Sequence, residues 1–460
     1  MPLDRRSVLS AGLGAGLGVG LAAGTANAGP RMDRSGPHAS GTRPSAAELG
    51  LEAGGAHDQA AALQAAIDEA AARGVPLELP PGRFRTGSLK LRPGVRMIGA
   101  ARMTALEFTG GGELLIADGA DGIVLEGLVL DGAYQTLSED EDNGLVVLRN
   151  CRGVRLRDLE VMRSAGNGLS LRGCSGSVAD CTVTAAMQTG IRSLDAIGLD
   201  IVHNAVADCA NNGIQVWRSE AGEDGSIVSG NRIARIRADG GGTGENGNGI
   251  NIFRARGVLV SGNRISDCAY SAVRGNAASD IQILANNCAR LGEVALYAEF
   301  AFEGALIANN LVDTAATGIS VTNFNEGGHL AVVQGNLVRN LFRREQEPED
   351  KRGHGITVEA DTIVTGNVIE SAPTAGLVVG WGPSMREVVA TGNLIRKSRV
   401  GILVTSEMGA GACLLANNMI SGAADGSIRA MDAEGRATGP ELAHGAGADT
   451  LLSIVGNVTV

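Results

Sequence analysis

A short apolar hexad recurs along most of the 460-residue chain, and its spacing restricts the fold more than any other feature. One copy is Asn-Gly-Ile-Asn-Ile-Phe at residues 248–253. The Gly or Ala at the second position of each copy falls at Gly144, Gly168, Gly190, Gly213, Gly249, Ala272, Ala295, Gly318, Gly355, Gly376 and Gly401. The intervals cluster near 23 residues, with two long exceptions of 36 and 37. A repeat of this length predicts a solenoid, in which each repeat packs against its neighbours.

Each hexad alternates apolar and polar residues, which predicts a strand with one face in a core. The expected inward residues between Gly249 and Gly355 are Ile250, Ile252, Val273, Leu296, Ala298, Ile319, Val321, Ile356 and Val358. The chain contains 68 Gly and only 3% aromatic residues, a composition that suits tight coils filled by aliphatic side chains. We therefore expect an all-β fold, a parallel β-helix of about 23 residues per coil, with its repeats in residues 131–460.

Asparagine marks a second fixed position in the repeat. The expected positions are Asn204, Asn231, Asn263, Asn287, Asn310, Asn336, Asn367, Asn393 and Asn418. Asn tolerates turn conformations and can hydrogen-bond to the equivalent residue of the next coil. We expect an asparagine ladder with a structural role and no chemistry.

The N-terminus predicts export. Arg5-Arg6 precedes a Gly- and Leu-rich run, and Ala26-Asn27-Ala28 offers small residues for cleavage. Residues 1–28 are thus expected to be a twin-arginine-type signal read by the Tat machinery, the alternative being an ordinary secretory signal. Residues 29–48 have the composition of a flexible linker. The mature protein is expected in the periplasm or secreted, without a membrane span once the signal is removed.

Residues 58–74 predict an amphipathic helix that caps the open end of the solenoid, followed by the first coils, within residues 49–130. The helix pattern from Asp58 and the Leu-Pro-Pro-Gly at 79–82 resemble the pectate-lyase and polygalacturonase superfamily of right-handed parallel β-helices. Together with the twin-arginine start, the repeat resembles more narrowly a family of exported bacterial repeat proteins of uncharacterised function. The resemblance implies a right-handed β-helix, and the outward-facing residues described below predict an envelope or extracellular polysaccharide as the partner.

Both long intervals carry their extra residues in the same connection, between the repeated Asn and the next hexad. The insertions are residues 238–247 and 342–352. We expect both loops to leave the same edge of the hexad sheet and to bound a face, and protruding loops on a rigid scaffold are where function concentrates.

The outward positions between these loops mix polar and aromatic residues. The expected outward set is Asn251, Phe253, Arg274, Asn276, Tyr297, Glu299, Ser320, Thr322, Thr357 and Glu359, continued by Arg192, Gln215 and Trp217. Such a face suits sugar hydroxyl groups and apolar ring faces, and the net charge of -11 disfavours nucleic acid. The predicted substrate-binding residues are Trp217, Asn251, Phe253, Asn276, Thr322 and His354.

Four residues of this face are the predicted catalytic set. Glu299 and Glu359 occupy equivalent positions two coils apart, about 9.6 Å along the stack, near the separation used by inverting glycosidases. A lyase would instead use Arg274 or Tyr297 as the base. The alternatives are a surface ion pair between Glu299 and Arg274, and a non-catalytic structural or interaction protein of the cell envelope.

The segment Gly353-His354-Gly355 is similar to the Gly-His-Gly motif of polygalacturonases. Those enzymes also need Asp just before the Gly of preceding coils, where this chain has Val294 and Thr317. A typical polygalacturonase is therefore disfavoured, and His354 is expected at the rim of the face. No metal site or cofactor is predicted. The acidic run at 139–142 leaves calcium binding as an alternative. We expect this run to form a solvated loop instead.

Overall fold

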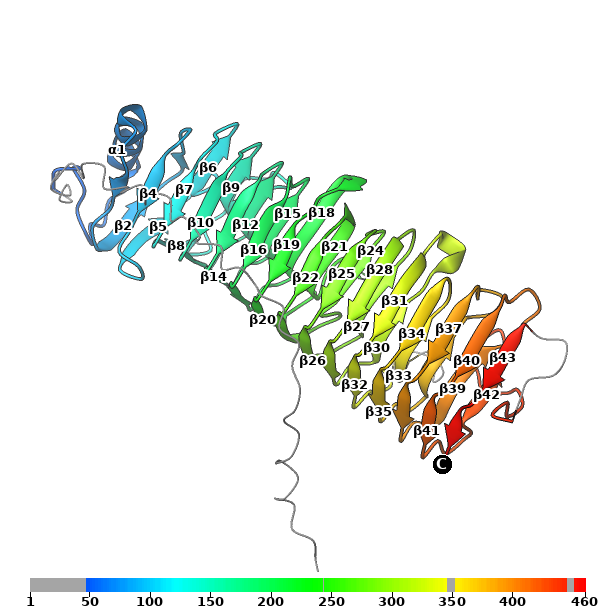
Figure 1. Ribbon diagram of the computed structural model, residues 1–460. Helices are drawn as coiled ribbons and strands as arrows, with labels where there is room; N and C mark the ends of the chain where they lie inside the picture. The colour runs from blue at the N-terminus through cyan, green and yellow to red at the C-terminus, as the bar shows by residue number, and fades with distance from the viewer. Residues whose placement is uncertain (1–46, 243, 346–351, 445–450) are drawn as a thin grey trace, which may run out of the picture. The chain divides into compact units, whose positions relative to one another are not determined.

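Each strand of the structure pairs with the equivalent strand one coil before it and one coil after it, so the coils stack along one axis (Figure 1). The computed structural model describes residues 47–242, 244–345, 352–444 and 451–460. The expected export signal and the expected linker up to residue 46 lie outside this part of the chain. Three sheets result, and the predicted all-β parallel β-helix is confirmed.

The sheets are named A, B and C in the order in which the chain enters them. Sheet A contains β1 (Leu77–Glu78), β4 (Arg96–Ile98), β7 (Val124–Glu126), β10 (Val154–Arg157), β13 (Gly176–Ala179), β16 (Leu199–Val202), β19 (Ile227–Ser229), β22 (Leu259–Ser261), β25 (Ile281–Leu284), β28 (Glu303–Ala308), β31 (His329–Gln334), β34 (Thr362–Thr365), β37 (Val388–Thr391), β40 (Cys413–Ala416) and β43 (Leu452–Val455). Sheet B contains β2 (Gly82–Thr86), β5 (Thr104–Phe108), β8 (Val129–Asp131), β11 (Glu160–Met162), β14 (Thr182–Thr184), β17 (Ala205–Ala207), β20 (Arg232–Ile236), β23 (Arg264–Cys268), β26 (Asn287–Leu291), β29 (Leu311–Asp313), β32 (Leu337–Arg339), β35 (Val368–Glu370), β38 (Leu394–Arg396), β41 (Met419–Ser421) and β44 (Val458–Thr459). Sheet C contains β3 (Leu89–Lys90), β6 (Leu115–Asp118), β9 (Gly144–Arg149), β12 (Asn167–Arg172), β15 (Thr189–Leu194), β18 (Asn212–Glu223), β21 (Asn248–Arg256), β24 (Val273–Asn276), β27 (Val294–Glu299), β30 (Thr317–Val321), β33 (His354–Val358), β36 (Ala375–Val379), β39 (Val400–Thr405) and β42 (Ile428–Met431).

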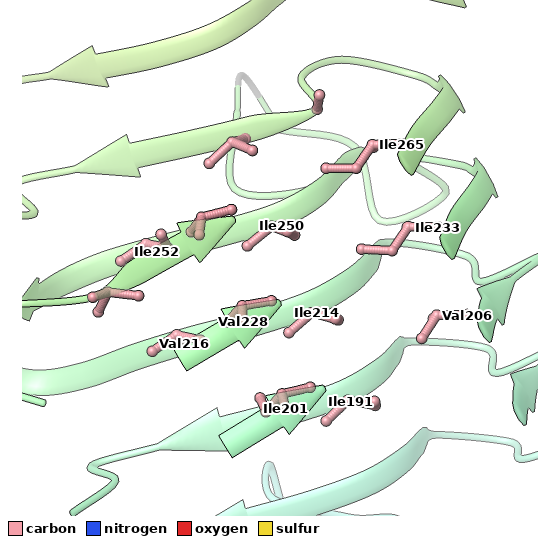
Figure 2. Close-up of a cluster of buried hydrophobic side chains, with 14 of the residues drawn as sticks. Ile191, Ile201, Val206, Ile214, Val216, Val228, Ile233, Ile250, Ile252 and Ile265 are labelled. Atoms are coloured by element: carbon pink, nitrogen blue, oxygen red, sulfur yellow. The ribbon is translucent and has the colours of Figure 1, made fainter. Parts of the chain in front are cut away.

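The hexads form sheet C, and their alternation is as predicted. Ile250 pairs with Val273, and every predicted inward residue from Ile250 to Val358 is buried. Figure 2 shows Ile250 and Ile252 beside inward residues of the other two sheets. The recurring Gly has a steric cause, because a Cβ on Gly249 would lie 2.4 Å from Cγ2 of Ile265 and 2.8 Å from the Ala272 carbonyl oxygen.

The predicted cap is the helix α1 (Ala60–Arg73). It packs against β1, β2, β3 and β4, and Leu63, Ala66, Ile67 and Ala70 are its buried residues. The helix ends at Gly74, whose φ of 64° is the left-handed conformation that Gly accepts without strain. Asp58 accepts a hydrogen bond from the Ala60 N–H at 2.7 Å, although Gln59 occupies the cap position. Among the described residues, no helix is both long and apolar enough to cross a bilayer.

The asparagine ladder runs along the turn between sheets A and B. In each step, the side-chain amide donates to the Oδ1 of the next Asn and to a backbone carbonyl, as Asn310 does to Asn336 (3.0 Å) and to Ile283 (2.9 Å). One predicted member is wrong: Asn286 occupies the ladder, whereas Asn287 starts β26 and points outward. The ladder also continues beyond Asn418 to Asn457.

Candidate functional site

The two insertions enter sheet C at the same edge, as predicted, since they precede β21 and β33. The described part of the first insertion does more than border the face, because it is hydrogen-bonded onto it. The Asn251 side-chain amide donates to the carbonyl oxygens of Gly244 (3.3 Å) and Glu245 (3.2 Å). In the second insertion, Arg352 approaches Glu293 at 3.3 Å. Residues 243 and 346–351 lie outside the described residues.

Two adjoining cavities lie on the outer face of sheet C. The first, here the aromatic pocket, has a volume of about 430 Å³ and is lined by Trp217, Phe253, Arg274, Glu299 and Phe300, among others. The second, here the glutamate pocket, measures about 260 Å³ and includes Thr322, His354, Glu359 and Trp381. Both are lined by Tyr297 and Arg352, so together they form one groove along the solenoid axis.

The strand register arranges the groove in two rows. Trp217 pairs with Phe253, Phe253 with Asn276, and Asn276 with Glu299. The same register carries this row on to Thr322 and Glu359, because Ala298 pairs with Val321 and Val321 with Val358. The second row contains Asn251, Arg274, Tyr297, Ser320 and Thr357. Tyr297 therefore stands in the row next to the one that contains Trp217 and Phe253.

Two aromatic rings form one end of the groove. The ring centroids of Trp217 and Phe253 lie 5.8 Å apart at an interplanar angle of 62°, an edge-to-face arrangement. The Trp217 Nε1–H donates to Asn251 Oδ1 at 3.0 Å, which fixes the indole against the sheet. The Arg254 guanidinium stacks over Phe253 at 4.7 Å. These contacts leave a rigid, half-buried apolar surface.

Glu299 lies in the aromatic pocket and forms an ion pair there with Arg274. Its Oε1 accepts from Arg274 Nε at 2.6 Å and from the Asn276 side-chain amide at 3.0 Å. The expectation of a surface ion pair is wrong in one respect: the pair exists, but the two side chains are only 9% and 2% exposed. The first insertion covers them, as shown by the approach of Gly244 to Arg274. Burial strengthens the attraction and makes loss of either partner costly.

Glu359, two coils further along the row, has a different environment. Its Oε2 accepts the Phe324 N–H at 2.7 Å, and no Lys or Arg of the described residues forms an ion pair with it. Burial raises the pKa of Glu359 to about 7, while hydrogen bonds from the Phe324 and Asn323 backbone oppose the rise. The two glutamates of one row therefore differ: Glu299 is ion-paired with Arg274, whereas Glu359 can carry a proton near neutral pH.

Sequence reasoning missed three residues that shape the groove. Glu293 is approached by Arg274 (3.7 Å), Arg344 (3.5 Å) and Arg352 (3.3 Å), and so links β27 to the second insertion. Arg352 and Trp381 line the glutamate pocket. Trp381 could have been found from composition, because the chain has only two Trp. The role of Glu293 depends on the path of the insertion, which no spacing in the sequence reports.

The remaining predicted residues also reach the groove. Thr322 hydrogen-bonds to Ser320, with 3.2 Å between their hydroxyl oxygens. His354 is not at the rim as expected, because it is 4% exposed and lines the glutamate pocket. The register of Val294, Thr317 and His354 places them as expected on successive coils.

The acidic run at 139–142 is not a solvated loop throughout. Asp142 is buried and pairs with Arg172 at 3.0 Å and with Arg192. These guanidiniums hold the pKa of Asp142 below its ordinary value despite burial. Within the described ranges, no group of three or more His, Cys, Asp or Glu side chains is arranged to hold a metal ion.

Comparison with known proteins agrees with this architecture. The family model "Right handed beta helix region" matches residues 143–338 and 222–395, which together exceed half of the chain. The catalytic unit of a thermostable GH87 alpha-1,3-glucanase from Streptomyces thermodiastaticus strain HF3-3 matches with a TM-score of 0.50 and 16% identity, over 90% of this chain and 68% of that one. The N-terminal fragment of the bacteriophage Phi29 gene product 12 matches with a TM-score of 0.52 and 16% identity, over 88% and 70%. At this identity the likeness concerns the fold, and the predicted right-handed winding is confirmed.

Proposed function

The chain belongs to the right-handed β-helix family, and on that basis we propose that it binds a polysaccharide in the groove on the outer face of sheet C. One observation carries the proposal: two cavities adjoin along the stacking axis, and each contains one of the chain's two Trp residues. From the coil of Trp217 to the coil of Trp381 there are six steps, about 29 Å at 4.8 Å per coil. A groove of this length accepts several sugar rings in a row.

The lining has the chemistry that a sugar chain requires. The Trp217 and Phe253 rings offer flat apolar surface to the carbon face of a sugar ring. The hydroxyls of Ser320, Thr322 and Thr357 offer donors and acceptors to sugar hydroxyl groups. The fold likeness to the catalytic unit of an alpha-1,3-glucanase supports a polysaccharide as the class of partner.

A second candidate function, hydrolysis of the bound chain, is favoured by the unlike environments of the two glutamates: Glu299 is ion-paired with Arg274, and burial raises the pKa of Glu359 to about 7. In this mechanism, Glu359 donates its proton to the glycosidic oxygen, and the leaving sugar departs as an alcohol. Glu299 accepts a proton from the water that attacks the anomeric carbon. The residues lie two coils apart, about 9.6 Å along the stack, which suits inversion rather than retention.

Elimination is the weaker alternative. Burial raises the pKa of Tyr297, so its phenol keeps its proton and is a poor base. Arg274, the other base suggested by the sequence, is ion-paired with Glu299 and lies near Glu293. A further alternative is a non-catalytic structural role in the cell envelope. In that case the same face would bind the polysaccharide and no product would form.

The proposal also includes export of the protein from the cytoplasm. The twin-arginine pattern at Arg5-Arg6 and the small residues 26–28 support transfer by the Tat machinery to the periplasm or the exterior. An envelope or extracellular polysaccharide is accordingly the proposed partner.

The test is to incubate the purified mature protein with a panel of neutral and uronate polysaccharides and to follow both binding and products. Retention on an immobilised glycan supports the binding proposal, and new reducing ends on that glycan support hydrolysis. Absorbance from an unsaturated sugar would instead show elimination and overturn the glutamate mechanism. Failure to retain any glycan, with the protein folded, would refute the proposed function.

A further inference from the structure

A separate concave basin lies on the outer face of sheet B, away from the groove on sheet C. It spans β17, β20, β23 and β26 and has a volume of about 420 Å³. Figure 2 shows Val206, Ile233 and Ile265 of these strands pointing into the core, so the alternate residues face outward. Those outward residues include Arg232, Arg264 and Asn287 in one row and small residues in the next.

The charged side chains that line this basin are all basic. Its lining contains Arg232, Arg264 and Arg290 and no Asp or Glu. The chain as a whole has 50 acidic residues against 39 basic ones, so a carboxylate would be the more common neighbour by chance. Arg290 is paired with Asp267, so Arg232 and Arg264 are the guanidiniums that give this cavity a local positive potential within an acidic protein.

Two of these arginines are exceptions to the pattern of their own sheet. Other arginines along sheet B and its following turn have carboxylate partners: Arg163 with Asp131, Arg235 with Asp208, Arg290 with Asp267, Arg339 with Asp313 and Arg396 with Glu370. Arg232 and Arg264 form no ion pair and no side-chain hydrogen bond with the described residues, and both are exposed. They pair in register on adjacent strands, where facing like charges destabilise a sheet.

The surroundings let a ligand approach these two groups closely. Beside them the outward residues are Ala205, Ala207, Ala234 and Ala289, which leave the basin open and line it with methyl groups. The next residue of the arginine row is Asn287, which is exposed and adds an amide donor. Asn287 is also the residue displaced from the ladder by Asn286, so no structural role accounts for its side chain.

We propose that this basin is a second binding site, which takes an oxyanion (a sulfate, phosphate or carboxylate group) between Arg232 and Arg264. An oxyanion bridging two guanidiniums would replace their repulsion by charge-assisted hydrogen bonds. The alanine methyl groups would contact the body that bears the anion. This site is independent of the groove on sheet C, and either can fail without the other.

The test is isothermal titration of the full mature chain with sodium sulfate, sodium phosphate, a uronic acid monosaccharide and a sulfated monosaccharide, with a neutral monosaccharide as the reference. We expect saturable binding of at least one anion, none of the neutral sugar, and weakening as sodium chloride is added. The free ions and the sugar-borne ions distinguish whether the methyl groups contribute. No saturable binding of any anion would overturn the proposal.

Two variants locate the site. Arg232→Gln with Arg264→Gln is expected to weaken anion binding about tenfold or more, because two charge-assisted contacts are lost. Arg339→Gln is the matched control, since Arg339 is an exposed arginine of the same sheet that is already paired with Asp313, and it should leave affinity unchanged. The thermal melting of the double variant should equal or exceed that of the parent, which establishes that it folds. Unchanged anion affinity in the folded double variant would contradict the assignment.

Discussion

Two stacks of side chains run along the same solenoid, and they differ in whether the residue type repeats from coil to coil. In the ladder between sheets A and B, every coil repeats one residue type and one hydrogen-bond pattern, from Asn204 to Asn457. In the groove row of sheet C, Trp217, Phe253, Asn276, Glu299, Thr322 and Glu359 follow one another without repetition. Both stacks arise from the same coil period, because each coil places one residue at the equivalent position.

The difference distinguishes side chains that stabilise the fold from side chains that are available to bind a ligand. A repeated Asn satisfies the backbone of each turn, so its replacement should damage stability and leave the groove chemistry intact. The groove row satisfies little of the backbone and brings unlike groups together, so its replacement should change binding or titration, and it should reduce stability where a buried charge loses its partner. Four substitutions test this distinction, and they are ordered from the largest expected effect to the smallest.

Replacing Asn310 by Ala should lower the free energy of unfolding by about 4 kcal/mol. The change leaves the Ile283 carbonyl and the Asn286 N–H buried without their partner, at about 1–3 kcal/mol each, and also creates a cavity. Urea unfolding followed by circular dichroism measures the loss. The neighbouring exposed residue provides the control, because Asn287→Ala should have almost no effect. Equal destabilisation by the two variants would mean that the ladder assignment is wrong.

Replacing Glu299 by Gln should lower the free energy of unfolding by about 3 kcal/mol, because the buried Arg274 guanidinium loses the carboxylate that it contacts at 2.6 Å. The same unfolding experiment applies. A second replacement, Arg274→Met in the Glu299→Gln background, should restore part of the loss, since the buried guanidinium is then removed together with its carboxylate partner. If the single variant were as stable as the parent, the pair would be solvated and the insertion would not cover it.

The titration of Glu359 should make stability fall as pH rises. The folded-state pKa of about 7 lies above the ordinary value of 4.5, so the folded state binds the proton more tightly than the unfolded state. The stabilisation is complete below pH 4.5 and is lost between about pH 4.5 and 7, by about 3 kcal/mol. Unfolding at a series of pH values measures it, and Glu359→Gln should flatten the profile in this window. A profile identical in both proteins would show that Glu359 titrates normally.

Replacing Trp217 by Ala should weaken binding of any retained polysaccharide about tenfold, through loss of roughly 1–2 kcal/mol of stacking surface. Affinity electrophoresis in a gel containing the polysaccharide measures the change. Arg339→Gln, which lies on another sheet, should migrate as the parent does. Unaltered retardation of Trp217→Ala would place the binding surface elsewhere.

Much of the fold could be predicted because residues within a single coil determine the repeat period. The Gly positions, the inward aliphatic residues and the capping helix all depend on alternation and on steric limits within one coil. The Asn287 error has the same origin, since Asn286 and Asn287 are adjacent and the spacing alone does not decide which of them points inward.

The site was predicted in outline and missed in detail for a physical reason. The rows of sheet C follow from strand alternation and the coil period, so the placement of Trp217, Phe253, Glu299 and Glu359 on one outer face was predicted. Burial of the Arg274–Glu299 pair, the depth of His354 and the role of Glu293 depend on insertions that fold back over the sheet. The path of such a loop is set by contacts distant in sequence, and no repeat encodes it.

The most direct test of the central claim uses the chain's own chromophores, because its two Trp residues, Trp217 and Trp381, lie in the two pockets of the groove. Intrinsic Trp fluorescence should change saturably when an oligosaccharide of a retained polysaccharide is added. Trp217→Phe and Trp381→Phe should each remove part of the signal, and the titration midpoint should match that from calorimetry. Calorimetric binding of the oligosaccharide without any change in Trp emission would contradict binding in the groove of sheet C.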